Sequence, residues 1–461
     1  MQGFISNHHN KEETVMRKMK ANIVPLRFRD ADEKEFYRIL DALKEIYQEE
    51  VSFLEPRTAG DELPEDADAV LFPVMWTNVY TEMDKLLRTI HVPSIVLTTT
   101  VGVSLMFDWE AVAYMKQKGL QVFNPHSVEL AKTVFKALAL KRDMKHQKFL
   151  VFHDSKGEGL IPEQFKIFYW WNDECIRDMK EKFGITIVHK SYKALGEKAR
   201  LIPDDAAREE MERWDFQEEV PYERPVLSAV KLFMAIRDEV DAEGDVVGCG
   251  ANCLNEGFFS ETTPCLAWSL LYQDRGIFWV CESDTSSLMT EYLIGSTIDC
   301  SLFTTNIYPF LSGMPALSHE KIQEFPDVAD PDDHALLVHC GYLGCVAQAM
   351  AKKWTLRPPV LGWHSWNIVG ENSIVVDAEV ETGDITLCKL RSDFNGLFVE
   401  KAVLEEYVQY PGSDCRNGGL IRVPDGYKLM EDICSHHMIV TTGKRTCQMK
   451  AVAEIFGLEV F

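Results

Sequence analysis

The stretch Trp279-Val280-Cys281-Glu282-Ser283-Asp284 ends an apolar run in two acidic residues. This pattern is typical of a buried strand that ends in a polar turn, and a helical pattern follows over residues 286–294. A second apolar run, over residues 300–304, leads to Asn306. In an α/β sheet the carboxyl ends of parallel strands meet at one edge, outside which ligands bind. We therefore expect Glu282 and Asn306 to face one pocket.

Length and charge limit the class of protein. A chain of 461 residues is too long for one hydrophobic core, and about 100–200 residues per domain predicts roughly two to four domains. Apolar residues make up 46% of the chain and charged residues 26%, which is typical of a soluble globular protein. Lys and Arg number 48 against 72 Asp and Glu. The resulting net charge of −24 repels phosphate backbones, so we expect no nucleic-acid partner.

Targeting signals and cysteines indicate a cytoplasmic location. No run of about 18 apolar residues occurs, so we expect no membrane contact, and the first twenty residues lack the apolar core of a signal peptide. The twelve cysteines include no CxxC pair. Several, such as Cys281 and Cys300, lie within apolar runs, where a free Cys packs as a small hydrophobe. We expect reduced thiols rather than a disulfide set or a zinc site.

Strands alternate with helices over the first two thirds of the chain. This alternation predicts two α/β domains, each built on a doubly wound parallel sheet. We place the first domain at residues 1–147. The second domain, at residues 148–316, begins with an apolar strand at 148–153 and carries Glu282 and Asn306.

From residue 317 onward the chain consists mainly of short apolar strands. We expect a mainly antiparallel, barrel-like β domain at residues 317–461, which carries His437. The turn Thr382-Gly383-Asp384 lies between two of these strands and predicts a hairpin. We also expect helices over residues 346–354 and 447–456.

Three side chains are candidate metal ligands. Glu282 and Asn306 lie at predicted strand ends, and His437 precedes the apolar strand that follows Ser435-His436. Carboxylate, amide oxygen and imidazole suit a hard-to-borderline divalent cation, for which we expect Mn²⁺, with Mg²⁺ or Co²⁺ as alternatives. The competing interpretation is a solvated turn in which an Asp or Ser caps the following helix. From the residue types alone, that second interpretation is the more common one.

Other side chains are candidates for lining a pocket. His339 and His364 lie near apolar strand-like segments, and Trp76 follows the third strand of the first domain. An aromatic ring at position 76 could stack on a sugar ring or cap the hydrophobic core, and its position leaves both possibilities open. No GxSxG motif is present, so the sequence does not indicate a serine hydrolase.

Three segments resemble the L-fucose isomerase and L-arabinose isomerase family. They are Thr263-Pro264-Cys265-Leu266-Ala267-Trp268-Ser269-Leu270-Leu271, Cys281-Glu282-Ser283-Asp284 and Ser435-His436-His437-Met438-Ile439-Val440-Thr441-Thr442-Gly443. In that family a glutamate, and an aspartate 24 residues later, bind the metal and act as acid and base. Glu282 stands at the glutamate position, and 306 − 282 = 24 puts Asn306 at the aspartate position. The resemblance implies that His437 is the metal-binding histidine.

The resemblance also implies a reaction and an assembly. Family members interconvert aldoses and ketoses through an enediol intermediate, so the implied partner is a small sugar substrate. Trp76 would stack on that substrate from a neighbouring subunit. From its place at a strand end, and not from the resemblance, we expect His339 to line the same site. The implied assembly is a homo-oligomer, a trimer or a hexamer, with sites at the subunit boundaries.

Asn306 departs from the family pattern. Its amide oxygen can bind a metal, but unlike a carboxylate it cannot take up a proton. Three functions therefore stay open: an aldose–ketose isomerase, an epimerase or lyase on the same scaffold, and a sugar-binding homologue without catalysis.

Overall fold

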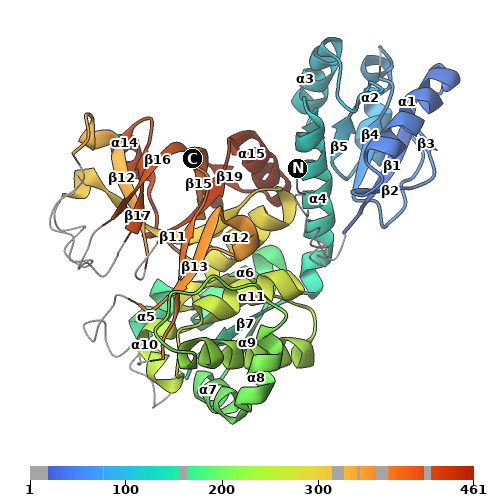
Figure 1. Ribbon diagram of the computed structural model, residues 1–461. Helices are drawn as coiled ribbons and strands as arrows, with labels where there is room; N and C mark the ends of the chain where they lie inside the picture. Colours follow the sequence, from blue (N-terminus) through green and yellow to red (C-terminus); the bar gives the residue numbers. More distant parts are fainter. Residues whose placement is uncertain are drawn as a thin grey trace, which may run out of the picture.

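Two parallel sheets and a closed antiparallel barrel form the frame of this mixed α/β protein (Figure 1). The computed structural model describes residues 19–75, 77–154, 163–313, 327–339, 343–359, 372–409 and 417–461. In this part of the chain no helix combines the length and the apolar character needed to cross a membrane. The ten cysteines in these ranges are all free thiols.

The first sheet is parallel and contains strands from the start of the chain, in the order β2-β1-β4-β5-β6, with β3 paired to β1. Its strands are β1 (Ala21–Arg27), β2 (Val51–Phe53), β3 (Arg57–Thr58), β4 (Ala69–Phe72), β5 (Ser94–Val96) and β6 (Val122–Phe123). The helices that connect them are α1 (Glu33–Ile46), α2 (Asn78–Thr89) and α3 (Trp109–Gln117). Helix α1 begins where the Asp32 carboxylate accepts two backbone N–H groups, and it buries an apolar face at helical spacing.

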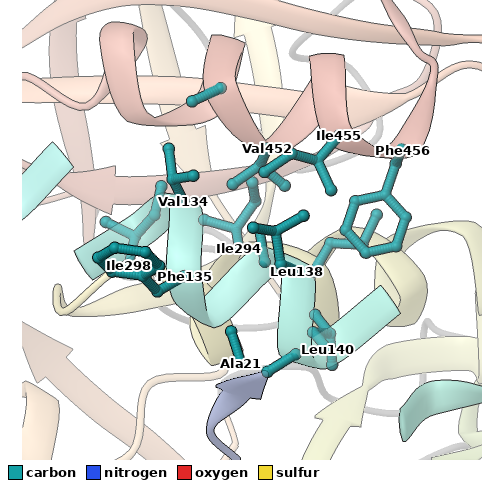
Figure 2. Close-up of a cluster of buried hydrophobic side chains, with 14 of the residues drawn as sticks. Ala21, Val134, Phe135, Leu138, Leu140, Ile294, Ile298, Val452, Ile455 and Phe456 are labelled. Atoms are coloured by element: carbon teal, nitrogen blue, oxygen red, sulfur yellow. The ribbon is translucent and has the colours of Figure 1, made fainter. Parts of the chain in front are cut away.

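Helix α4 (Val128–Asp143) joins this first unit to the rest of the molecule. In Figure 1 the first sheet lies to the right of α4, and the second sheet and the barrel lie to its left. Figure 2 shows that α4 contributes Val134, Phe135 and Leu138 to a buried cluster. Leu140, also labelled, comes from α4 as well. The other labelled members come from β1, from the helix α12 (Thr285–Thr297) and the residue that follows it, and from the C-terminal helix α15 (Thr446–Phe456). This cluster is the core between the units.

The second sheet is also parallel, in the order β10-β9-β7-β8. Its strands are β7 (Lys148–Phe152), β8 (Thr186–Lys190), β9 (Val246–Ala251) and β10 (Phe278–Val280). The helices of this unit are α5 (Glu163–Phe168), α6 (Asp173–Phe183), α7 (Tyr192–Leu201), α8 (Asp204–Met211), α9 (Arg224–Glu243), α10 (Cys253–Glu256), α11 (Cys265–Arg275) and α12. One or more helices lie between successive strands of this sheet, which agrees with the expected alternation of strand and helix.

The barrel closes because β15 pairs with both β18 and β16. The ring runs β15-β18-β11-β12-β17-β16 and returns to β15, which leaves no free edge in it. Its strands are β11 (Leu302–Pro309), β12 (His334–Val338), β15 (Gly383–Leu390), β16 (Gly396–Gln409), β17 (Asn417–Arg422) and β18 (His437–Thr442), with β19 (Glu459–Val460) added to β16. Helix α14 (Gly426–Asp432) lies between β17 and β18 in the chain. The expected antiparallel barrel is confirmed.

Strand β11 corrects one expectation. We expected the strand that ends at Asn306 to extend a parallel sheet beside Glu282, and this was wrong. Instead β11 pairs antiparallel with β12 on one side and with β18 on the other. An apolar strand is buried equally well in a sheet or in a barrel wall, so its sequence pattern does not reveal which of them it joins.

Two local expectations between residues 346 and 384 were also wrong. Residues 348–350 form only a 3-10 turn, and the last two residues of the expected helix begin the strand β13 (Lys353–Arg357). That strand pairs with β14 (Val375–Glu379) in a separate two-stranded sheet, so β14 does not form the hairpin that we expected with β15. Pairing between distant strands has overridden the local pattern.

We predict that Phe135→Ala destabilises the protein by about 3–5 kcal/mol, because it opens a cavity in the core between the units. Phe135 is fully buried, and its ring lies 5.0 Å from that of Tyr47. Urea unfolding followed by tryptophan fluorescence measures the loss. Phe107→Ala is the matched control, because Phe107 is 80% exposed. Equal effects of the two substitutions would contradict this account of the core.

Candidate functional site

Glu282 lies in a strained turn directly after β10. Glu282 and Ser283 both have a φ of +59°, in the left-handed region that non-glycine residues enter at a cost of about 1–2 kcal/mol each. Gly250 on the neighbouring strand β9 makes room for this turn, since a Cβ there would lie 2.9 Å from the Ser283 Cα. Strain of this kind persists only where the surroundings enforce it, and it concentrates at functional sites.

Asp284 begins helix α12 and joins three other side chains. One carboxylate oxygen accepts the Ser287 backbone N–H at 2.9 Å, which confirms that an Asp caps this helix. The other oxygen, Oδ2, lies 2.9 Å from His437 Nδ1 and 3.0 Å from Lys389 Nζ. The turn is not solvated, however, because Glu282 is 7% exposed and Asp284 only 1%. The interpretation of this segment as a solvated turn with a helix cap is therefore right about the cap and wrong about the solvent exposure.

His437 connects the turn to the barrel. It is the first residue of β18 and pairs directly with Asn306 on β11. While its Nδ1 faces Asp284, its Nε2 lies 3.3 Å from Glu282 Oε2. When the Nδ1–H donates to Asp284, the Nε2 lone pair is free for a cation, which is the arrangement that carboxylates impose on metal-binding histidines.

The ligand atoms of Glu282, His436 and His437 lie within 4.8 Å of one another and could hold a metal ion. Asn306 fits the same centre, because its Oδ1 is buried without a hydrogen-bond partner while its Nδ2 donates to the Tyr308 hydroxyl at 3.2 Å. Because buried polar atoms are nearly always paired, this oxygen on the strand opposite His437 makes Asn306 a further candidate ligand. Sequence reasoning assigned only His437 of the adjacent pair, although the pair itself was a signal for His436.

Two aromatic side chains border the cluster. The Tyr169 hydroxyl hydrogen-bonds with the Glu282 carboxylate, and its ring stacks on that of His437 at 6.1 Å. His339 directly follows β12, is buried, and has its ring 6.2 Å from that of His437. Tyr169 was missed, because nothing in its local sequence points to Glu282. Trp76 and His364 lie outside the described residues.

Burial and the polar neighbours shift the pKa values of the cluster in opposite directions, and the neighbours together have the larger effect. Burial alone would raise the pKa of Glu282, but the bonds from His437 and Tyr169 lower it below its usual value. Burial would likewise raise the pKa of Asp284, and the nearby Lys389 charge and His437 hold it well below its ordinary range. Burial would lower the pKa of His437, and its bonds to the two carboxylates raise it instead. The metal-free cluster therefore favours a charged imidazole between two carboxylates.

Lys389 is a fully buried cation that sequence reasoning missed. It lies on β15, where its ammonium contacts Asp284 and the Ser287 hydroxyl and lies 5.3 Å from the Trp170 ring centre. A buried charge is tolerated only when it is paired and hydrogen-bonded. Lys389 thus holds the Asp284 carboxylate ionised and in place behind His437.

We predict that Lys389→Met destabilises the fold by about 3–5 kcal/mol, because it removes the ammonium that pairs with the buried Asp284 carboxylate and leaves that charge with His437 as its one charged partner. The matched control is Lys136→Met, which breaks the ion pair with the exposed Asp299 at 2.8 Å and should cost less than about 1 kcal/mol. The free energy of unfolding in urea tests both. Similar losses for the two variants would contradict the role given to Lys389.

We predict that the affinity for Mn²⁺ rises with pH and that binding releases a proton. The raised pKa of His437 keeps its imidazole protonated above the usual range, and a cation must displace that proton. Affinity should therefore fall about tenfold per pH unit below the His437 pKa and level off above it. Calorimetry in two buffers of different ionisation enthalpy, between about pH 6 and about pH 9, measures both effects.

His437→Gln should lose Mn²⁺ binding. His91→Gln is the control, because His91 is exposed, and it should keep the full pH dependence. An affinity that does not change with pH would contradict His437 as a ligand.

No protein-family model and no curated protein matches this chain. The function is therefore argued from the geometry and chemistry of the site.

Proposed function

We propose that the protein is a metal-dependent aldose–ketose isomerase that acts on a sugar or sugar derivative through an enediol intermediate. One observation carries this proposal. Glu282, in a strained turn after the sheet strand β10, converges with His436 and His437 at the start of barrel strand β18, and the unpartnered oxygen of Asn306 lies on the strand directly opposite His437.

The ligand set defines what a metal would do. A divalent cation, with Mn²⁺ preferred and Mg²⁺ or Co²⁺ as alternatives, would bind two substrate oxygens and lower the cost of negative charge on them. Glu282 and His437 would hold it together with the Asn306 amide oxygen. Asp284 is not one of the proposed ligands, because Lys389 and Ser287 occupy its oxygens. It supports the centre by orienting His437.

Glu282 is the proposed base. Its lowered pKa keeps the carboxylate ionised, so it can take the proton from the carbon beside the carbonyl and return it to the neighbouring carbon. The Tyr169 hydroxyl stays protonated, since burial raises its pKa, and it orients Glu282. Asn306 cannot move protons between the two substrate oxygens, so another group must perform that transfer.

The same asparagine favours a second candidate function. With one proton-transferring carboxylate fewer, the scaffold could serve an epimerase or lyase, or bind a sugar without catalysis.

We further propose that the two parallel sheets form doubly wound domains, and that the protein is a cytoplasmic homo-oligomer, a trimer or hexamer. In that assembly Trp76 of a neighbouring subunit and His339 would line the sugar site.

Two measurements separate these functions. Elemental analysis of the purified protein determines the bound metal, and assays with added Mn²⁺ follow aldose–ketose interconversion over pentoses, hexoses and deoxysugars. Bound metal together with interconversion supports the isomerase. Metal without interconversion, but with another reaction on a sugar, supports altered chemistry. Absence of metal and of turnover on every sugar overturns both enzymatic functions.

We predict that Asn306→Asp raises the affinity for Mn²⁺ at least about tenfold and increases isomerase activity, because a carboxylate adds a negative ligand and a proton acceptor. Calorimetry and the interconversion assay measure the two effects. Asn395→Asp is the control, as Asn395 is exposed in the turn between β15 and β16. If Asn306→Asp abolished an activity of the natural protein, the asparagine would belong to different chemistry.

A further inference from the structure

A cavity of about 440 Å³ lies at the amino edge of the second sheet, the edge opposite the metal cluster. Its floor includes the first residues of β9 and β10, Val246 and Phe278, and Tyr292 on α12. Glu49 and Glu50, which lie between α1 and β2, line it from the first unit. A cavity of this size can hold a small organic molecule.

The floor of the cavity is apolar and buried. Four of its side chains come from the starts of β9 and β10 and from α12, and none is more than 8% exposed: Val246, Ile277, Phe278 and Tyr292. Covering an apolar surface with the hydrocarbon part of a ligand is favourable, because it removes that surface from water. The floor therefore suits a ligand with an apolar body.

The charges around this floor are mainly negative. Four acidic residues line the cavity against two basic ones: Glu49, Glu50, Asp245 and Asp299 against Lys136 and Arg275. Both basic side chains are already held by carboxylates, since Lys136 pairs with Asp299 at 2.8 Å and Arg275 pairs with Asp274 at 2.8 Å. The resulting negative potential favours a cation and repels an anion.

Glu50 supplies an acceptor for such a cation. It is only 6% exposed, and one of its oxygens, Oε1, lies 3.1 Å from Lys132 Nζ on α4. The other oxygen, Oε2, is buried without a hydrogen-bond partner. A carboxylate oxygen can only accept, so the partner that it lacks is a donor. Because Glu50 lines the cavity, a ligand bound there can supply that donor.

We propose that this cavity binds a small organic ammonium ion, that is, a primary amine with an apolar body. The ammonium group donates to Glu50 within the acidic rim, and the hydrocarbon covers the floor at Phe278 and Tyr292. This inference is independent of the proposed function, because the cavity and the metal cluster lie at opposite ends of β10.

Calorimetry of phenethylamine with the full-length protein, with and without Mn²⁺, tests the proposal. Phenethyl alcohol and phenylpropionate keep the ring but carry a neutral and a negative group in place of the ammonium, and ethylamine keeps the ammonium without the ring. Phenethylamine should bind at least about tenfold more tightly than each of the three, since it alone matches both the acidic rim and the apolar floor. Mn²⁺ should not compete with it.

Two substitutions should change this affinity in opposite directions. Glu50→Gln removes the negative charge and should weaken phenethylamine binding at least about tenfold. Lys132→Met removes the cation that already neutralises Glu50, so binding should become about threefold tighter or more. Glu62→Gln is the matched control, because Glu62 is exposed and does not line the cavity, and it should leave the affinity unchanged.

A third variant tests the cavity itself and keeps the proposal testable if a charge variant fails to fold. Ser296 lines the cavity from α12 and is half-buried, so the ring of Ser296→Phe should fill part of the space and abolish phenethylamine binding. The thermal unfolding midpoint of each variant determines whether it is folded.

Several outcomes would overturn the inference, and each leaves the proposed function intact. If phenethylamine does not bind to the natural protein, the cavity is not an amine site. Equal binding of phenethyl alcohol, or tighter binding of phenylpropionate, would overturn the assignment of a cation. If folded Glu50→Gln and Ser296→Phe bind phenethylamine as the natural protein does, or if Mn²⁺ displaces it, the amine binds elsewhere.

Discussion

The buried contact between Asp284 and Lys389 is the constraint on which the site depends. Asp284 begins α12 in the second α/β unit, and Lys389 lies on barrel strand β15, so their contact joins two parts of the molecule. The same carboxylate oxygen fixes the Nδ1 side of His437 on another barrel strand. Two unpaired charges in this position would be too costly to bury, which makes the relative position of sheet and barrel a condition for the site.

The site therefore lies at a seam rather than within one sheet. The sheet contributes Glu282 through a left-handed turn that Gly250 accommodates. The barrel contributes the histidine pair and, directly opposite on β11, Asn306. A closed barrel holds these two strands in fixed register, so the imidazole and the amide oxygen stay close without a ligand to gather them. This preorganisation favours a metal centre over a set of surface acids.

The metal cluster differs from the apolar core in its chemistry and in its backbone. Around α4 the cluster between the units is apolar and buried, and its contribution is stability. At the metal cluster the Asn306 Oδ1 is buried without a hydrogen-bond partner, and the backbone is strained at Glu282. A fold that leaves hydrogen bonds unmade loses stability at those positions, so they are the places to look for ligand binding.

The sequence by itself determined the alternating strands and helices of the α/β units, the antiparallel barrel, the Asp284 cap, and Glu282 and His437 as candidate ligands. The elements and the cap follow from local periodicity and a cap signal. The residue types allowed the two ligands, and the resemblance to the isomerase family selected them. Only the tertiary structure decided that β11 belongs to the barrel and that Tyr169 and Lys389 support the cluster. The contacts of Asp284 with Lys389 and with His437 span 105 and 153 residues, and no local pattern encodes a pairing over that separation.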